Sequence, residues 1–358
     1  MQEFDFHTVE LDRSIPAVVI LDQTRLPRQE LYLTLTDEES LWEAIYHLKV
    51  RGAPAIGVAA ALGIYVCMAG KKALKETSSF QKEFSRVKDY LASARPTAVN
   101  LFWALERMEG ALKQALREGK SVPGLLEALE KEALAVLEED RQICRSLGEN
   151  GLRLLKPGMG ILTHCNAGAL ATAGMGTALA PVYLGQQRGY GFHVFADETR
   201  PLLQGARLTC WELSKAGVDV TLICDNMASM AMKNGWIQAV ITGCDRVAAN
   251  GDSANKIGTS AVAILAKEYG IPFYIAAPLS TIDVNCREGK DIRIEERAGK
   301  EISEMWYTHP MAPEGIKTYN PAFDVTDHRY ITALITEKGI LRPPFTASIR
   351  QALSLPEG

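Results

Sequence analysis

The pattern of apolar and polar positions changes in character near residue 155. Before that point apolar residues recur at helical spacing, with a capping box at Thr36 and Glu39 and a break at Arg95-Pro96-Thr97. Two short extended runs, Ala17–Leu21 and Leu31–Leu35, come first and predict a small β-hairpin. The helical segments are Leu41–Leu48, Ala53–Ala69, Phe80–Leu91, Val99–Leu116 and Leu125–Leu155. We therefore expect a mainly helical N-terminal domain over residues 1–155.

After Lys156-Pro157-Gly158 the pattern becomes one of short apolar runs that alternate with helical segments. Such alternation predicts a parallel sheet with helices wound on both faces, so residues 156–358 form an α/β domain. The expected strands are Ile161–Thr163, Val194–Ala196, Val218–Cys224, Ala239–Thr242 and Phe273–Ala277.

Polar residues come directly after the carboxyl ends of four of these predicted strands. His164-Cys165-Asn166, Asp197-Glu198, Asp225-Asn226 and Asp245 all come directly after apolar runs. The carboxyl ends of parallel strands line one rim, where ligands bind, although loops after strands are polar in any case. The sequence thus favours a small-molecule site on this rim.

Cys165 and Asp245 are the candidate reactive groups of the rim. A cysteine at a strand end could be a nucleophile, a base or a shaped donor, whereas a lone cysteine is more often a core residue. An apolar wall beside Asp245, supplied by Val240-Ile241 and Val247, would raise the pKa of its carboxyl and make it a proton donor near neutral pH. Together the two groups suit acid–base chemistry, and we expect His164 to be structural.

Two stretches suit an anion such as a phosphate. Thr242–Thr259 is a polar loop that leads into a helix and directs backbone N–H groups and Lys256 toward one point. Arg51-Gly52-Ala53 precedes a helix that begins near Pro54, where a tight helix corner is the alternative. A third stretch, Asp197 to Gln204, reads as a helix opened by acidic residues, with Gln204 able to reach a ligand hydroxyl.

The net charge, the apolar windows and the cysteine spacing argue against several classes of function. The net charge is -4 and no basic stripe occurs, so nucleic acid is not an expected partner. No uninterrupted apolar window of membrane length and no signal pattern is found, and the seven cysteines lack C-x-x-C spacing, which indicates a reduced, cytoplasmic protein without a membrane segment. No metal site is indicated. The absence of G-x-G-x-x-G and Walker spacing argues against a nucleotide cofactor.

Seven segments, taken in order along the chain, resemble the motifs of the methylthioribose-1-phosphate isomerase family. They run from the early helices to the last segment, which makes the resemblance specific. They are Arg51–Gly57, Thr163–Leu170, Asp197–Gly205, Asp225-Asn226, Gly243–Arg246, Asn255–Thr259 and Asn320–Thr326.

The resemblance implies a Rossmann-like second domain, a homodimer without cofactor or metal, and a step of methionine salvage. In that step 5-methylthioribose 1-phosphate becomes 5-methylthioribulose 1-phosphate. By the family pattern Asp245 donates the proton that opens the ring and Cys165 assists the transfer from C2 to C1, as a hydride shift or through an enediol. The implied substrate-binding residues are Arg51, Gly52, Ala53, Arg95, Gln204, Asn255 and Lys256.

The same resemblance extends to proteins with other functions. Isomerases of 5-deoxyribose 1-phosphate and of ribose 1,5-bisphosphate share much of the pattern. Regulatory subunits of a eukaryotic translation-initiation nucleotide exchange factor belong to the family as well, but generally lack the cysteine and aspartate pair. An isomerase of another sugar phosphate and a non-catalytic sensor of sugar phosphate or nucleotide are therefore the alternatives.

Overall fold

A computed structural model describes residues 5–96 and 98–355. Residues 1–145 with 168–176 form one compact unit, and residues 146–167 with 177–358 form another. The division between these units falls within one long helix, and the domain boundary that we predict after residue 155 stays a prediction. The outer ends of both predicted domains, and Thr97 of the predicted helix break, lie outside the described residues.

The first unit begins with an antiparallel sheet rather than a simple hairpin. The predicted pair is present as β2 (Ala17–Leu21) and β3 (Tyr32–Leu35), and β1 (Val9–Asp12) adds a third strand in the order β1-β2-β3. Val9 lies opposite Ile20 and Leu11 opposite Val18. The four-residue β1 carries little apolar alternation of its own, and this pairing with β2 accounts for it.

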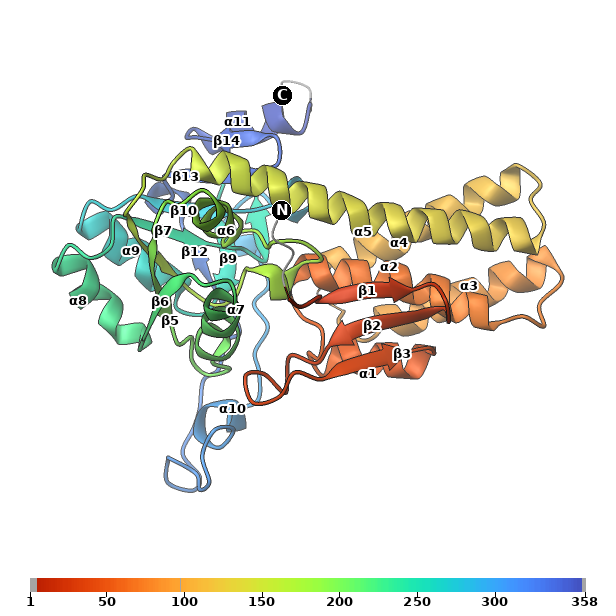
Figure 1. Cartoon of the computed structure of the whole chain (residues 1–358), viewed down its shortest axis with the longest axis horizontal. Helices are drawn as coiled ribbons and strands as arrows, with labels where there is room; N and C mark the ends of the chain where they lie inside the picture. Colours follow the sequence, from red (N-terminus) through yellow and green to blue (C-terminus); the bar gives the residue numbers. More distant parts are fainter. Residues whose placement is uncertain (1–4, 97, 356–358) are drawn as a thin grey trace. The chain divides into compact units, whose positions relative to one another are not determined.

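Five helices complete the first unit, and α5 continues into the second (Figure 1). They are α1 (Glu38–Tyr46), α2 (Ala53–Gly70), α3 (Thr77–Ala92), α4 (Val99–Arg117) and α5 (Val122–Leu152). The cap of α1 is Asp37, whose carboxylate accepts the Ser40 N–H, so the capping box expected at Thr36 is wrong. A carboxylate at the helix N-terminus is the stronger acceptor.

Helix α2 is the central helix of this unit. It is buried from Ala55 to Met68 and packs against α1, α3 and α4. Small residues permit this closeness, since a Cβ on Gly57 would lie 3.1 Å from the Asn100 carbonyl oxygen. By length and composition α2 could cross a membrane, but 72% of its apolar window is buried within the protein, as in the core helix of a soluble fold.

The second unit is built on a seven-stranded sheet in the order β14-β13-β10-β7-β4-β5-β6. All five predicted strands are present, and the pairs among them are parallel. β13 adds a sixth parallel strand, and β14 pairs with it antiparallel at the edge. The bounds are β4 (Gly160–Thr163), β5 (His193–Asp197), β6 (Asp219–Ile223), β7 (Ala239–Thr242), β10 (Phe273–Ala276), β13 (Ala333–Thr336) and β14 (Gly339–Leu341).

Helices cover both faces of this sheet, as the alternating pattern predicts. Residues of α8, α9 and α11 join strand residues in one apolar core. On the other face a Cβ on Gly151 of α5 would meet Pro181 of α6 and Ile335 of β13. The described α-helices of this unit after α5 are α6 (Ala180–Gln187), α7 (Cys210–Lys215), α8 (Ala228–Lys233), α9 (Thr259–Glu268), α10 (Lys300–Ser303) and α11 (Phe345–Ala352).

A second, four-stranded sheet corrects the expectation of one long polar loop between β7 and α9. Its order is β11-β8-β9-β12, with β11 (Ile282–Asp283), β8 (Arg246–Ala248), β9 (Ser253–Lys256) and β12 (Phe323–Thr326). Asn255 and Lys256 are thus strand residues. Their pairing partner β12 lies more than sixty residues later, and a local pattern cannot reveal such a partner.

Candidate active site

Cys165 lies two residues beyond β4 in a left-handed backbone conformation, with φ at 66°. This conformation costs a non-glycine residue about 1–2 kcal/mol. Two buried hydroxyls hold it there: the Cys165 N–H donates to Thr199 Oγ1 at 2.9 Å, and its carbonyl oxygen accepts from Thr209 Oγ1 at 2.7 Å. The cysteine itself is partly exposed, so its strained turn presents the thiol at the rim of the sheet.

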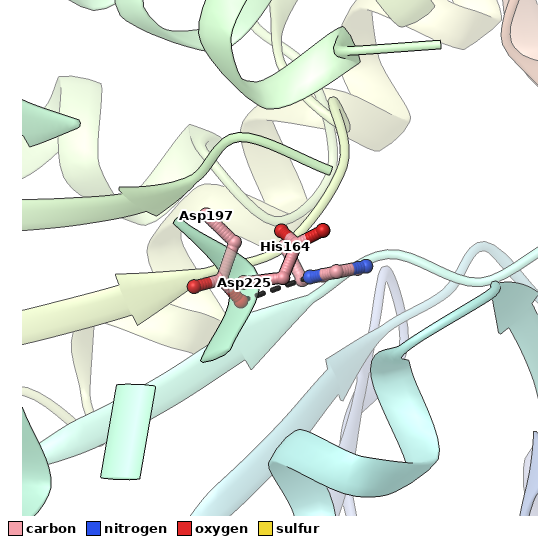
Figure 2. A group of neighbouring side chains, drawn as sticks. All are labelled: His164, Asp197 and Asp225. Carbon is pink, nitrogen blue, oxygen red and sulfur yellow. Dashed lines mark hydrogen bonds and ion pairs between the residues drawn. The ribbon is translucent and has the colours of Figure 1, made fainter. Parts of the chain in front are cut away.

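The residue before it, His164, forms a buried pair with Asp197 at the end of β5 (Figure 2). His164 Nδ1 lies 2.9 Å from Asp197 Oδ2, and both side chains are almost wholly buried. His164 Nε2 lies 2.8 Å from the Ile257 carbonyl oxygen. Because a carbonyl only accepts, Nε2 carries a proton and donates it. The histidine therefore connects three segments, in keeping with the structural role expected of it.

Burial and mutual attraction act in opposite directions on this pair. Burial raises the pKa of Asp197 to about 6, although the hydrogen bond from His164 lowers it. Burial lowers the pKa of His164, but the hydrogen bond to Asp197 and its charge outweigh that effect, so the pKa is raised. The attraction between the two side chains therefore favours the charged form of each.

Asp225 completes the group in Figure 2. Its carboxylate accepts the N–H groups of Thr199 and Arg200, each at 2.7 Å. The ligand atoms of His164, Asp197 and Asp225 lie within 4.8 Å of one another, a spacing that could hold a cation. His164 Nδ1 and both Asp225 oxygens already have protein partners, whereas the buried Asp197 Oδ1 has no hydrogen-bond partner among the described residues.

The segment after Asp197 does not open a helix with capping acids, which corrects our interpretation. Thr199 and Leu203 have φ values of 65° and 55°, and a π-helical turn, Gly205–Thr209, precedes α7. Asp197 is paired with His164 instead of capping. Gly205 approaches so closely that a Cβ there would lie 1.7 Å from the Asp197 carbonyl oxygen.

Gln204 lies in this segment and is 6% exposed. Its Oε1 has no hydrogen-bond partner among the described residues. A buried acceptor without a donor costs about 1–3 kcal/mol unless another group supplies one. A ligand hydroxyl would satisfy it.

Asp245 follows β7, and its N–H donates to the Ala254 carbonyl oxygen of β9 at 2.9 Å. The side chain is exposed. The apolar wall expected from Val240, Ile241 and Val247 therefore does not bury the Asp245 carboxyl in the free protein. Water exclusion around it would have to come with the substrate.

Asn255 and Lys256 lie on β9. Asn255 Nδ2 donates to Thr259 Oγ1 at 3.0 Å. Lys256 is only 7% exposed, and its Nζ lies 4.9 Å from the ring centroid of Phe323, the residue opposite on β12. A buried ammonium group is a strong point charge for an anion.

The N-terminus of α9 is occupied by a side chain of the protein itself, whereas a phosphate at Lys256 stays a prediction. Asp324 accepts the Gly258 N–H at 2.8 Å, the Ser260 N–H at 3.2 Å and the Ser260 hydroxyl at 2.8 Å. The protein's own carboxylate thus takes the place of an external anion.

The loops that carry these residues touch one another. A Cβ on Gly243, two residues before Asp245, would lie 2.6 Å from the Ala167 Cβ, two residues after Cys165. Gly258 has φ +102°, and a Cβ there would lie 2.9 Å from His164 Cε1. The loops of Cys165, Asp245 and Lys256 are therefore neighbours within the second unit.

The remaining predicted residues belong to the first unit. Gly52 has φ +93°, and a Cβ there would lie 2.6 Å from backbone atoms of Ala171, so only glycine fits. Arg51 precedes it and Ala53 opens α2. Arg95 lies between α3 and α4, where its carbonyl oxygen accepts the Ala98 N–H. A ligand-binding role for these four residues stays a prediction.

Several known proteins are similar to this chain over nearly its whole length. A model of the Initiation factor 2 subunit family matches residues 49–343. A protein of Symbiobacterium thermophilum named methylthioribose-1-phosphate isomerase is 64% identical over 343 residues, which cover 96% of this chain and 95% of that relative. The 5-deoxyribose 1-phosphate isomerase of Petrotoga mobilis is 57% identical, with coverages of 96% and 98%.

A solved structure agrees with the sequence relatives. The crystal structure of 5-methylthioribose 1-phosphate isomerase from Pyrococcus horikoshii has a TM-score of 0.91 and 40% identity, and the match covers 97% of this chain and 96% of that one. The resemblance inferred from the motifs and the α/β fold class are confirmed, and the protein is an enzyme of the isomerase class. The chain belongs to the Initiation factor 2 subunit family.

Proposed function

We propose that this sugar-phosphate isomerase converts 5-methylthioribose 1-phosphate to 5-methylthioribulose 1-phosphate, a step of methionine salvage. The observation that supports this most is the 64% identity, over 96% of the chain, to a relative named for that substrate. The strained presentation of Cys165 on a loop adjacent to that of Asp245 supports it independently.

The substrate determines what the residues must do. Its anomeric carbon carries the phosphate, so the ring does not open by simple mutarotation. In our proposal Asp245 gives a proton to the ring oxygen as the bond from C1 to that oxygen breaks. A hydrogen then moves from C2 to C1 with the assistance of Cys165, and the C2 hydroxyl loses its proton to become the ketone.

This sequence of steps balances internally. One proton enters at the ring oxygen and one leaves the C2 hydroxyl, while oxidation at C2 equals reduction at C1. No external oxidant or reductant is consumed, and the reaction therefore needs no redox cofactor. The residues supply proton transfer, orientation and charge.

For substrate binding we propose the residues implied by the resemblance. The unpartnered Gln204 Oε1 would accept a sugar hydroxyl, and the buried Lys256 would attract the phosphate, with Asn255 beside it. Arg51, Gly52, Ala53 and Arg95 complete the proposed set. A homodimer and a cytoplasmic location are proposed on the same basis, and light scattering of the purified protein tests the dimer.

A second candidate substrate is 5-deoxyribose 1-phosphate, which the 57% identical relative favours. The two sugars differ only at C5, where one carries a methylthio group. Parallel assays by phosphorus NMR, with each 1-phosphate supplied to the same enzyme preparation, separate them. We expect a higher kcat/KM with the methylthio sugar. Turnover of the deoxy sugar alone would replace the proposal with the second candidate.

A further inference from the structure

We propose that Thr199 and Thr209 are positioning residues for this isomerase, because their hydroxyls hold Cys165 in the backbone conformation that presents its thiol. The inference rests on the proposed role of Cys165 in the reaction. Thr199 lies within the Asp197–Gly205 motif, where the sequence assigns it no role, and Thr209 lies in none of the motifs.

Backbone strain is concentrated at this place. Five non-glycine residues in the described part of the chain have positive φ, and Cys165, Thr199 and Leu203 are three of them. Thr199 is β-branched, which makes its φ of 65° especially unfavourable. Strained residues persist only where their surroundings over-determine them. The hydrogen bonds from Thr199 and Thr209 hold Cys165 in this conformation.

Each threonine hydroxyl makes one hydrogen bond to the Cys165 backbone and a second one to a neighbouring residue. Thr199 Oγ1 accepts the Cys165 N–H at 2.9 Å and donates to the Asp197 carbonyl oxygen at 3.0 Å. Thr209 Oγ1 donates to the Cys165 carbonyl oxygen at 2.7 Å and accepts from Asn166 Nδ2 at 3.1 Å. Both threonines are fully buried, so water cannot replace either hydroxyl.

Further hydrogen bonds hold the two threonines in place. Asp225 accepts the Thr199 N–H, and Asn166 bonds Glu212, which in turn accepts the Tyr183 hydroxyl at 2.8 Å. Glu212 is fully buried. This support leaves the Cys165 peptide little freedom to relax to a negative φ, and the direction of its thiol is therefore set by the two hydroxyls.

Threonine variants test the proposal in the full-length enzyme. Thr199→Val and Thr209→Val keep the volume but remove both hydrogen bonds, whereas Thr199→Ser and Thr209→Ser keep the hydroxyl as matched controls. We expect kcat to fall at least about tenfold in the valine variants with KM changed far less, and to return to within about threefold of the parent in the serine variants. Iodoacetamide alkylation of Cys165, followed by peptide mass spectrometry across pH, should change in rate only in the valine variants. Valine variants that keep the parent's kcat and alkylation profile would overturn the proposal.

A second comparison does not depend on activity or on the folding of the valine variants. Glycine accepts a positive φ and alanine does not, so Cys165→Gly should melt about 2 °C or more above Cys165→Ala. An alanine variant at least as stable as the glycine variant would show that the turn is not held under strain and would overturn the proposal. If both variants instead turn over substrate at the parent's rate, the proposed role of Cys165 fails while the melting comparison still stands.

Discussion

The carboxylate of Asp324 at the N-terminus of α9 is predicted to stabilise the second unit. It accepts two backbone N–H groups and the Ser260 hydroxyl, all within 3.2 Å. Loss of a helix cap costs about 1 kcal/mol, and hydrogen bonds to a charged group contribute about 1.5–3 kcal/mol. Since the bonds share one carboxylate and are not additive, we expect Asp324→Ala to lower the free energy of unfolding by about 3 kcal/mol. Thermal melting should fall by about 6 °C.

A matched control and an anion titration sharpen this test. Ser260→Ala removes only the hydroxyl bond and should cost about 1 kcal/mol or less. In Asp324→Ala the exposed N–H groups become an anion site, so added phosphate should raise the melting temperature of this variant more than that of the parent. Equal melting of Asp324→Ala and Ser260→Ala, or an equal phosphate response in variant and parent, would refute the assignment of this helix end to Asp324.

Two further predictions concern the first unit. Burial raises the pKa of Asp140 to about 6 from 3.8, so between these pH values the folded protein holds a proton that the unfolded chain releases, and stability falls as pH rises. Urea unfolding of Asp140→Asn should therefore gain about 2 kcal/mol over the parent between pH 4 and pH 7, and a pH-independent difference would count against a buried proton. Arg51→Gln should raise KM at least about tenfold in steady-state assays, as loss of a phosphate contact requires, while the exposed Arg13→Gln should match the parent. Equal KM values in these two variants would remove Arg51 from the site.

The sequence predicts the main sheet well because its strands are short apolar runs that end in polar residues. β4 and β7 are examples in which the sequence indicates both the strand and the candidate residue after it. The sequence does not predict the strand at Ser253–Lys256, because its residues are polar and it is stabilised by pairing with the distant strand β12. The same pairing brings Asp324 to the N-terminus of α9, a contact that the local sequence does not reveal.

The candidate site shows the same limit. Residue types at strand ends identify Cys165 and Asp245, but they do not reveal that Cys165 is strained, since no glycine marks its left-handed turn. Thr209 lies in a π-helical turn and has no distinguishing local pattern. Its contact with Cys165 joins residues 44 positions apart, which only the folded chain displays.

Single-turnover conversion of 5-methylthioribose 1-phosphate tests most directly whether Asp245 and Cys165 carry out one isomerisation. With binding measured separately by calorimetry, Asp245→Asn and Cys165→Ser should each bind substrate as the parent does and convert it at least about a hundredfold more slowly. Conversion at the parent's rate by the Asp245→Asn variant, which cannot donate a carboxyl proton, would contradict the account.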